Sequence, residues 1–266
     1  RNPIDRFIAA KSQAAGLVHS AEADKATLIR RVTLDLTGLP PTPTDVADFL
    51  ADTSPDAYEK VVERLLHSVP HAERLTLNWL DAARYADTHG LQLDTGRTMW
   101  PWRDWVIQAF RENKPFSEFT IEQLAGDLLP KATRAQRVAT GFNRNHPARG
   151  EDQREEATKI VVDRVNTMAS VWLGLTLTCA QCHDHKYDPI PQKEYYQLYS
   201  FFANVPNQGL DGNTGNTYPL LHLPTPQQEG ILAEYQRAIT KVQHEVSPFA
   251  VKFAEARQKW EEQKPQ

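Results

Sequence analysis

The sequence predicts a mostly α-helical protein, an irregular multi-helix domain with long loops and no substantial β-sheet. Apolar residues recur three and four positions apart through most of the first 200 positions, the spacing that places them on one face of a helix. No convincing run alternates between apolar and polar side chains, as a half-buried strand does. The 18 prolines and 12 glycines divide the helical stretches into separate elements.

The first 37 residues contain two helical patterns. Ile4 and Ile8 lie on one face of the first pattern, and Leu28, Val32 and Leu36 lie on one face of the second. We therefore expect two helices before the proline-rich stretch that follows.

Residues 38–43, Gly-Leu-Pro-Pro-Thr-Pro, end the second pattern, because proline lacks a backbone donor and restricts the residue before it. Thr42 or Thr44 is expected to cap the helix that follows. Ser54, standing before Pro55, is expected to cap the next helix, whose apolar face begins at Tyr58.

Helical spacing predicts six further helices before residue 203, and the last of these is rich in aromatic side chains that we expect to pack in the core. Their expected ranges are 72–87, 101–112, 117–129, 133–142, 154–175 and 189–202.

The composition of the last 60 residues predicts a change of organisation. The segment 207–216 is rich in asparagine and glycine, so residues 207–224 are expected to form a loop or linker between the helical domain of residues 1–206 and an extension. Residues 225–266 carry spaced apolar residues in a charged background and predict one or two helices leading toward a domain that is absent here.

Charge and hydropathy exclude two classes of partner. A net charge of -4 and a pI near 6.2 give no broad positive field, which argues against nucleic-acid binding. No apolar run approaches the roughly 20 residues that span a bilayer.

The chain begins with Arg1 and shows no signal-peptide pattern, so any export signal is expected to lie upstream.

The strongest motif is Cys179-Ala-Gln-Cys182-His183, which contains both cysteines of the chain. This spacing is typical of c-type haem attachment, in which two thiols add to the porphyrin vinyl groups and the adjoining imidazole becomes an axial ligand of the iron. We therefore expect one covalent haem c at Cys179 and Cys182, with His183 as a metal ligand.

Two other interpretations of the motif, a zinc site and a redox-active cysteine pair, compete with haem attachment. A zinc site would use both cysteines with His183 or His185, but no second Cys-x-x-Cys or His-x3-His completes a set of four ligands. A thioredoxin-like redox pair needs a strand-to-helix turn, whereas the surrounding sequence predicts helix and loop. Haem attachment is favoured over both.

Several stretches together resemble one known family. They are LIRRVTLDLTGLPPTP, ARYADTHG, WPWRDWVIQAF, FTIEQLAGDLLP, DRVNTMASVWLGLTLTCAQCHDHKYDPI and QKEYYQLYSFFANVP. Between about Ile4 and Pro206 the chain is similar to the planctomycete cytochrome-associated (PSCyt2-type) family, a domain of unknown function. The resemblance implies haem at Cys179 and Cys182 with His183 as proximal ligand. It also implies an exported protein, often accompanied by a separate cytochrome c domain or a second uncharacterised domain.

The second axial position of the iron decides between electron transfer and catalysis. His146, in a polar loop before the helix leading to the motif, is the favoured distal ligand, with Met168 and His89 as alternatives. His185 lies too close to His183 to cross the macrocycle and is expected to pack or to form hydrogen bonds nearby.

Charged residues have two expected roles around this site. Asp184 and Asp188 are candidates for orienting imidazoles, and Arg144 is a candidate partner for the haem propionates. The other arginines expected to share that role are Arg149, Arg154 and Arg164. Arg84 and Arg103 are expected to form buried structural ion pairs with Asp81, Asp87 or Asp104.

The favoured function is that of a periplasmic or otherwise extracytoplasmic monohaem cytochrome that transfers electrons to a redox partner protein or fused domain. One alternative is a haem enzyme, such as a peroxidase or an oxidoreductase acting on a small organic molecule, with an open distal side. A second is a binding module for a carbohydrate-derived or protein ligand, stapled by haem or zinc.

Overall fold

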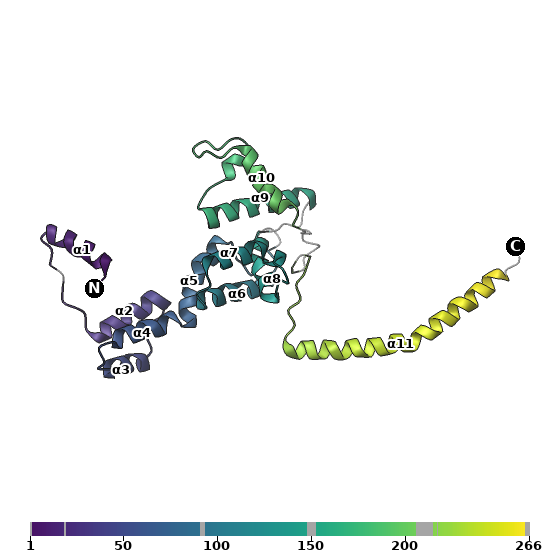
Figure 1. Ribbon diagram of the computed structural model, residues 1–266, viewed down its shortest axis with the longest axis horizontal. Coiled ribbons are helices and arrows are strands. Elements are labelled where there is room, and N and C mark those ends of the chain that lie inside the picture. The colour runs from purple at the N-terminus through teal and green to yellow at the C-terminus, as the bar shows by residue number, and fades with distance from the viewer. Residues whose placement is uncertain are drawn as a thin grey trace. The chain divides into compact units, whose positions relative to one another are not determined.

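The computed structural model describes residues 2–18, 20–90, 94–147, 153–205, 215–216 and 218–263. Within these ranges it contains eleven α-helices, short 3₁₀ and π segments and no strand, and one antiparallel bridge joins Thr88 to Gly96. The prediction of a mostly α fold without a sheet is therefore confirmed (Figure 1). The chain separates into two units, residues 1–219 and 220–266, each described by itself below.

The first unit begins with α1 (Pro3–Ala14), which buries no residue. Its capping box is closed by Asn2 and Asp5, whose side chains each accept a hydrogen bond from the other's backbone N–H. The expected first helix is therefore present.

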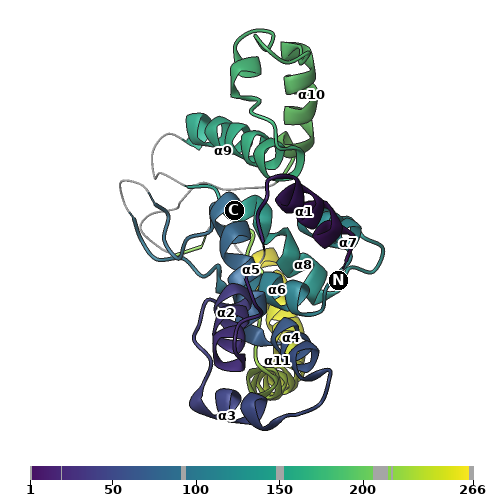
Figure 2. The same cartoon turned by 90° about the vertical axis from the view of Figure 1, so that its left-hand side faces the viewer.

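The next three helices, α2 (Lys25–Thr37), α3 (Pro43–Ala51) and α4 (Ala57–Leu66), pack on one another (Figures 1 and 2). Their shared core is apolar and consists of Ile29, Val32, Phe49, Ala57, Val61 and Leu65. Thr42 caps α3 as predicted. The expected cap at Ser54 is wrong: Asp56 is the N-cap residue of α4, because the Ser54 N–H and hydroxyl are bonded to Asp52 in the preceding turn.

The helices α5 (Val69–Ala82), α6 (Trp100–Arg111), α7 (Phe116–Ala125) and α8 (Arg134–Ala139) follow, with 3₁₀ turns at Gly126–Leu128 (η1) and Thr140–Arg144 (η2). Ser68 caps α5, which starts three residues earlier than predicted. The predicted end near Asp87 is wrong, because Arg84 adopts a left-handed backbone (φ 58°) and stops the helix.

Aromatic rings fill the core of these helices. Trp102 is almost fully buried and lies 6.5 Å from the ring centroid of Phe142, and Trp79 meets Trp172 edge to face at 4.8 Å. Trp172 belongs to the π segment Ala169–Leu173 (η3), which continues α9 (Gln153–Met168). The ring of Trp172 therefore joins the end of α9 to this core.

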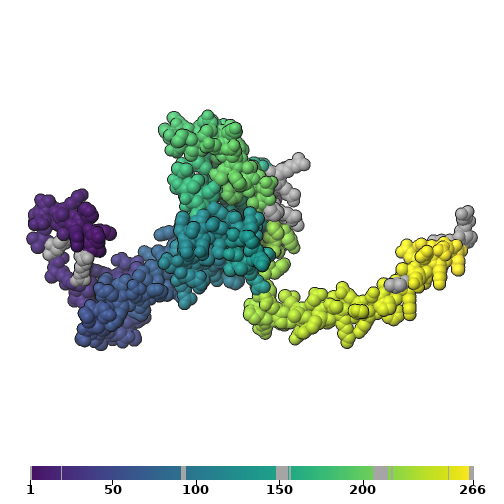
Figure 3. Space-filling view, viewed as in Figure 1, coloured from purple at the N-terminus to yellow at the C-terminus, as the bar shows by residue number. Residues whose placement is uncertain are grey.

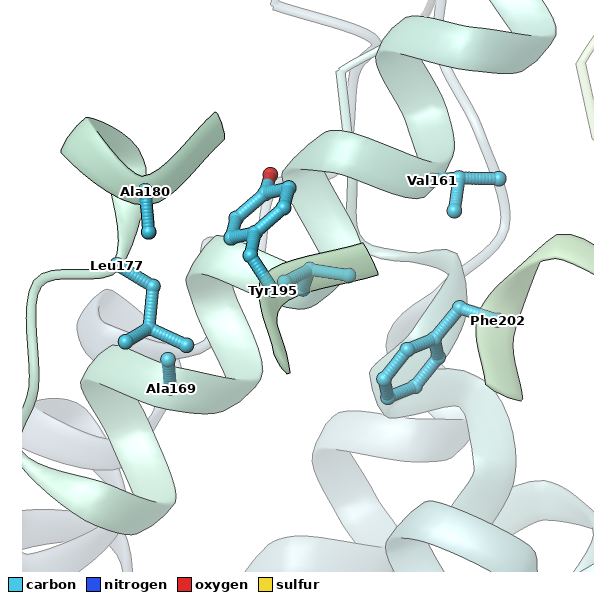
Figure 4. Packing of buried hydrophobic residues seen from close by; sticks show 7 residues of the cluster. Val161, Ala169, Leu177, Ala180, Tyr195 and Phe202 are labelled. Atoms are coloured by element: carbon cyan, nitrogen blue, oxygen red, sulfur yellow. The ribbon is translucent and has the colours of Figure 1, made fainter. Parts of the chain in front are cut away.

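The last part of the first unit contains the cysteine motif. After Gly174, a left-handed residue (φ 64°) that ends η3, the chain forms the 3₁₀ turn η4 (Thr178–Gln181) and then α10 (Gln192–Ala203). Leu177 lies between Ala169 and Ala180, and Tyr195 faces them from α10 (Figure 4). This cluster fixes η4 against α9 and α10.

The second unit contains one long helix, α11 (Pro226–Glu262), so the C-terminal segment predicted as one or two helices is one. Thr225 and Gln228 form its capping box, and Pro248 lies inside it. Figure 3 shows α11 as a single rod of side chains. Its apolar residues are exposed within this unit: Ile231, Leu232, Tyr235, Ile239, Val242, Val246, Phe249, Phe253 and Trp260.

No helix in the described ranges combines the length and the apolar character needed to cross a membrane. Half of the proposed linker at 207–224, residues 207–214 and 217, lies outside the described residues. That division of the chain stays a prediction.

The close approach of η1 to α8 generates the first test. A Cβ added at Gly126 would lie 2.3 Å from the backbone carbonyl oxygen of Gln136, which cannot rotate away. We expect Gly126→Ala to lower the free energy of unfolding by about 2 kcal/mol, through the backbone shift that overpacking forces. The measurement is a urea unfolding curve.

Gly96→Ala is the matched control, since its added Cβ would meet only the carbonyl oxygen of Asp87 at an ordinary 3.9 Å. Equal stability of the two variants would contradict this packing.

Candidate functional site

The two cysteines lie on the same side of the η4 turn. Leu177 and Ala180, three residues apart, are buried, whereas Cys179 and Cys182, also three residues apart, are exposed and free of any disulfide bond. A 3₁₀ turn has three residues per turn, so residues three apart align along it. Burial of one pair therefore presents both thiols outward together.

His183 follows directly and is also exposed. Its Nδ1 lies 2.7 Å from the backbone carbonyl oxygen of Asp184. Because a carbonyl oxygen only accepts, Nδ1 carries the proton and donates it, which leaves the lone pair on Nε2. An imidazole that binds a metal through one ring nitrogen is normally oriented by a hydrogen bond from its other ring nitrogen, as the Asp184 carbonyl provides here.

The segment after the motif is fastened to α10. The Asp184 carboxylate accepts the backbone N–H of Gln192 at 2.8 Å, at the first residue of α10. The carbonyl oxygen of Gln181 accepts the Gln192 side-chain N–H at 3.1 Å and the Tyr196 hydroxyl at 3.0 Å. These bonds hold both ends of the motif in place without using Cys179, Cys182 or the His183 Nε2.

His185 stabilises the turn that follows the motif. Its side chain is only 4% exposed, and its Nδ1 accepts the backbone N–H of Asp188 at 2.9 Å. The Asp188 carboxylate is 3.3 Å from the same nitrogen. A ring nitrogen that accepts an N–H carries no proton, so the bond from the Asp188 backbone belongs to the neutral ring. An ion pair with the Asp188 carboxylate requires a protonated ring. The structure thus places His185 in packing and turn formation.

The donor set of the motif fits a covalently attached haem. It comprises two accessible thiols on one side of a turn and an adjacent imidazole whose Nε2 is free to bind iron. Within the described ranges no group of three or more His, Cys, Asp or Glu side chains is arranged to hold a metal ion.

Met168 belongs to the same neighbourhood as the motif. It is partly buried and packs against the cluster that contains Leu177 and Ala180. Of the three expected distal candidates, Met168 is the one that packs against the cluster containing Leu177 and Ala180. Its role as an iron ligand stays a prediction.

His146 lies in a different environment. It is 6% exposed and lines a cavity with Asn143, Asn145 and Arg164. Burial, together with the positive charges of Arg164 and Arg144, lowers the pKa of His146 to about 3. The residues lining this cavity come from the end of α5, η2 and α9, and none comes from the cysteine motif. The structure therefore places His146 away from the segment it was predicted to serve.

The other predicted cofactor contacts are also distributed. Arg144 lies near His146, and burial lowers the pKa of its guanidinium. His89 is buried, and its Nε2 is 2.7 Å from the carbonyl oxygen of Gly215. Arg149 and the side chain of Arg154 lie outside the described residues.

The predicted ion pairs differ from the structure in burial and in one partner. Arg103 does pair with Asp104, at 2.9 Å, but neither side chain is buried. Arg84 pairs with Asp163 of α9 instead of Asp81, Asp87 or Asp104. The left-handed conformation at Arg84 ends α5 beside α9, so its partner comes from a helix about 80 residues later in the chain.

The polar cavity around Arg164 was not predicted as a site. A signal was present in the sequence: Arg164 occupies an apolar helical position between Ile160, Val161 and Val165. A charged residue at such a position is buried, and a buried charge needs a specific partner. Its closeness to Asn145 and His146 could not be read from the spacing.

The fold and the site together define a helical domain that presents a Cys-x-x-Cys-His segment on its surface. The chain belongs to the PSCyt2 family, described as "Protein of unknown function (DUF1549)", whose model matches residues 3–207. No curated protein and no solved structure matches the chain.

The environment of His146 predicts a dependence of stability on pH. Between about pH 6.5 and 3 the unfolded imidazole binds a proton that the folded one does not, so acidification favours unfolding. This histidine contributes a slope of up to about 1.4 kcal/mol per pH unit. We expect His146→Gln to flatten the pH dependence of the unfolding free energy by that amount, measured by urea unfolding at several pH values. An unchanged slope would show that His146 is not buried as described.

Proposed function

We propose that this protein is a c-type cytochrome domain that binds one haem covalently and transfers single electrons. The observation that carries the proposal is the pair of outward-facing thiols of Cys179 and Cys182 beside an imidazole, His183, whose Nε2 is left free. The family to which the chain belongs is of unknown function, so the proposal rests on the motif itself.

Each residue of the motif has a defined task in this proposal. The thiols of Cys179 and Cys182 would hold the haem through two thioether bonds. The His183 Nε2 would be the protein's ligand to the iron, while the Asp184 carbonyl oxygen holds the other ring nitrogen. When bound, the haem supplies a one-electron Fe(III)/Fe(II) couple.

Exposure of the motif favours electron transfer over buried catalysis. Both cysteines and His183 lie on the surface of the first unit, so the edge of an attached haem would be accessible to a redox partner or a fused domain. Covalent attachment of this type takes place outside the cytoplasm, so we also propose an extracytoplasmic location.

Attachment can be tested by removing the thiols. After expression with the haem-attachment machinery and export, wild-type protein should keep its haem through denaturation and acid extraction. Cys179→Ala/Cys182→Ala should lose it completely, because no thioether can form. Lys186→Ala, a change of an exposed residue in the same segment, is the control and should keep it. Loss of colour from the wild type on extraction would refute covalent binding.

The reaction class is tested by the optical spectrum with and without carbon monoxide. An electron carrier with both axial positions filled should give a low-spin spectrum that carbon monoxide leaves unchanged. Met168→Ala then tests whether Met168 is the second ligand, since loss of the ligand should make the iron high-spin. A wild-type iron that binds carbon monoxide would contradict electron transfer and favour the enzyme.

A further inference from the structure

The helix α11 exposes every side chain that the structure describes on it. It has 37 residues, from Pro226 to Glu262, and the apolar residues along it are as exposed as the charged ones. A helix in a protein gains most of its stability from the packing of its apolar face, and an exposed apolar surface of this extent marks an interaction site. The pattern of apolar residues along α11 indicates which kind of partner the face fits.

The apolar residues of α11 follow a seven-residue repeat. From Leu232 to Trp260 the first and the fourth residue of every heptad is aliphatic or aromatic, and none is charged. The first positions are Leu232, Ile239, Val246, Phe253 and Trp260, and the fourth positions are Tyr235, Val242, Phe249 and Ala256. A repeat of this period, kept over four heptads, is typical of the seam of a left-handed coiled coil.

Pro248 does not interrupt this seam. It occupies the third position of its heptad, on the side of the helix turned away from the first and fourth positions. Its ring removes one backbone donor, yet α11 continues past it to Glu262. The apolar seam therefore runs through the proline without a polar residue in it.

We propose that α11 pairs with the α11 of a second copy of this chain in an antiparallel coiled coil. In an antiparallel pair, each first position of one helix lies opposite a fourth position of the other. Placing Val246 opposite Phe249 of the second copy aligns the rest of the seam between Tyr235 and Trp260 in the same way. The two-fold axis then passes through the middle of the seam.

Side-chain sizes match in this register. Each phenylalanine lies opposite a valine, and Ala256 lies opposite Ile239. The facing pairs are Val246 with Phe249, Val242 with Phe253, Ile239 with Ala256 and Tyr235 with Trp260. In a parallel pair in register each residue would face its own copy, so that phenylalanine layers would be overfilled and the Ala256 layer underfilled. Packing therefore favours the antiparallel pair.

Charges beside the seam favour the same orientation. Glu245 and Lys252 are the last residues of consecutive heptads, and in the antiparallel register each lies beside the other's copy, which gives two opposite-charge pairs. In a parallel pair, Lys252 would instead lie beside Arg257 of the second copy, which gives two like-charge pairs. Arg257 also pairs with Glu261 of its own helix, but this contact is the same in both orientations.

The first test is the mass of the full chain by sedimentation equilibrium over a range of concentrations. We expect a concentration-dependent dimer of the 30.2 kDa chain. A single chain's mass up to the solubility limit would mean that a different partner covers the seam, and a mass of three chains would mean a different bundle. Either result would overturn the proposal.

The orientation is tested by reversing one charge. Lys252→Glu should weaken the antiparallel dimer about tenfold, because two opposite-charge pairs become two like-charge pairs. The double change Glu245→Lys/Lys252→Glu should restore the dimer. Lys241→Glu is the matched control, since it makes the same change of net charge at a third position outside the seam, and it should leave the dimer unchanged. A dimer strengthened by Lys252→Glu would be parallel, and the antiparallel assignment would be wrong.

The seam itself is tested by placing a charge at its centre. Phe249 is 70% exposed and belongs to none of the described core clusters, so Phe249→Glu should leave the Tm of the monomer unchanged while abolishing the dimer. A dimer that survives this change would form through another surface and would refute pairing through α11. Because the seam contains no residue of the cysteine motif, Cys179→Ala/Cys182→Ala should dimerise like the wild type, so this proposal and haem attachment fail independently.

Discussion

Burial of Leu177 and Ala180 against α9 and α10 is the constraint on which the candidate haem site depends. Both residues lie in the apolar cluster that includes Tyr195, and their burial sets the rotation of the η4 turn. With that rotation fixed, Cys179 and Cys182 face outward together. The side of the turn that carries the chemistry is thus determined by residues that take no part in it.

The hydrogen bonds that anchor the motif do not use its reactive atoms, which are the two cysteine sulfurs and the His183 Nε2. The Gln181 carbonyl and the Asp184 carboxylate anchor the loop to α10, and the Asp184 carbonyl occupies one nitrogen of His183. His185, which the sequence places almost beside His183, is buried and fixes the following turn. Neighbouring histidines therefore serve different purposes, one structural and one available to a metal.

The helix α9 connects two chemically different regions of the first unit. One of its faces packs beneath the cysteine motif, and another carries Arg164 into a polar cavity with Asn145 and His146. The first region is apolar beneath an exposed motif, and the second is buried with donors and acceptors left unpaired.

The helical class and several of its capping residues were predictable because apolar spacing and caps such as Thr42 are local in sequence. The end of α5 was not, since Arg84 is left-handed there and pairs with Asp163, a residue distant in sequence. Cys179, Cys182 and His183 were identified from adjacent positions alone. The surroundings of His146 were not, because Arg164 reaches them from a separate helix.

The most direct test of the central claim is tandem mass spectrometry of the tryptic peptide of the exported, matured protein. Cleavage after Arg164 and Lys186 releases residues 165–186, which contain both cysteines. The account predicts that this peptide carries one haem bonded through the sulfurs of Cys179 and Cys182. Recovery of the same peptide with two free thiols would contradict it.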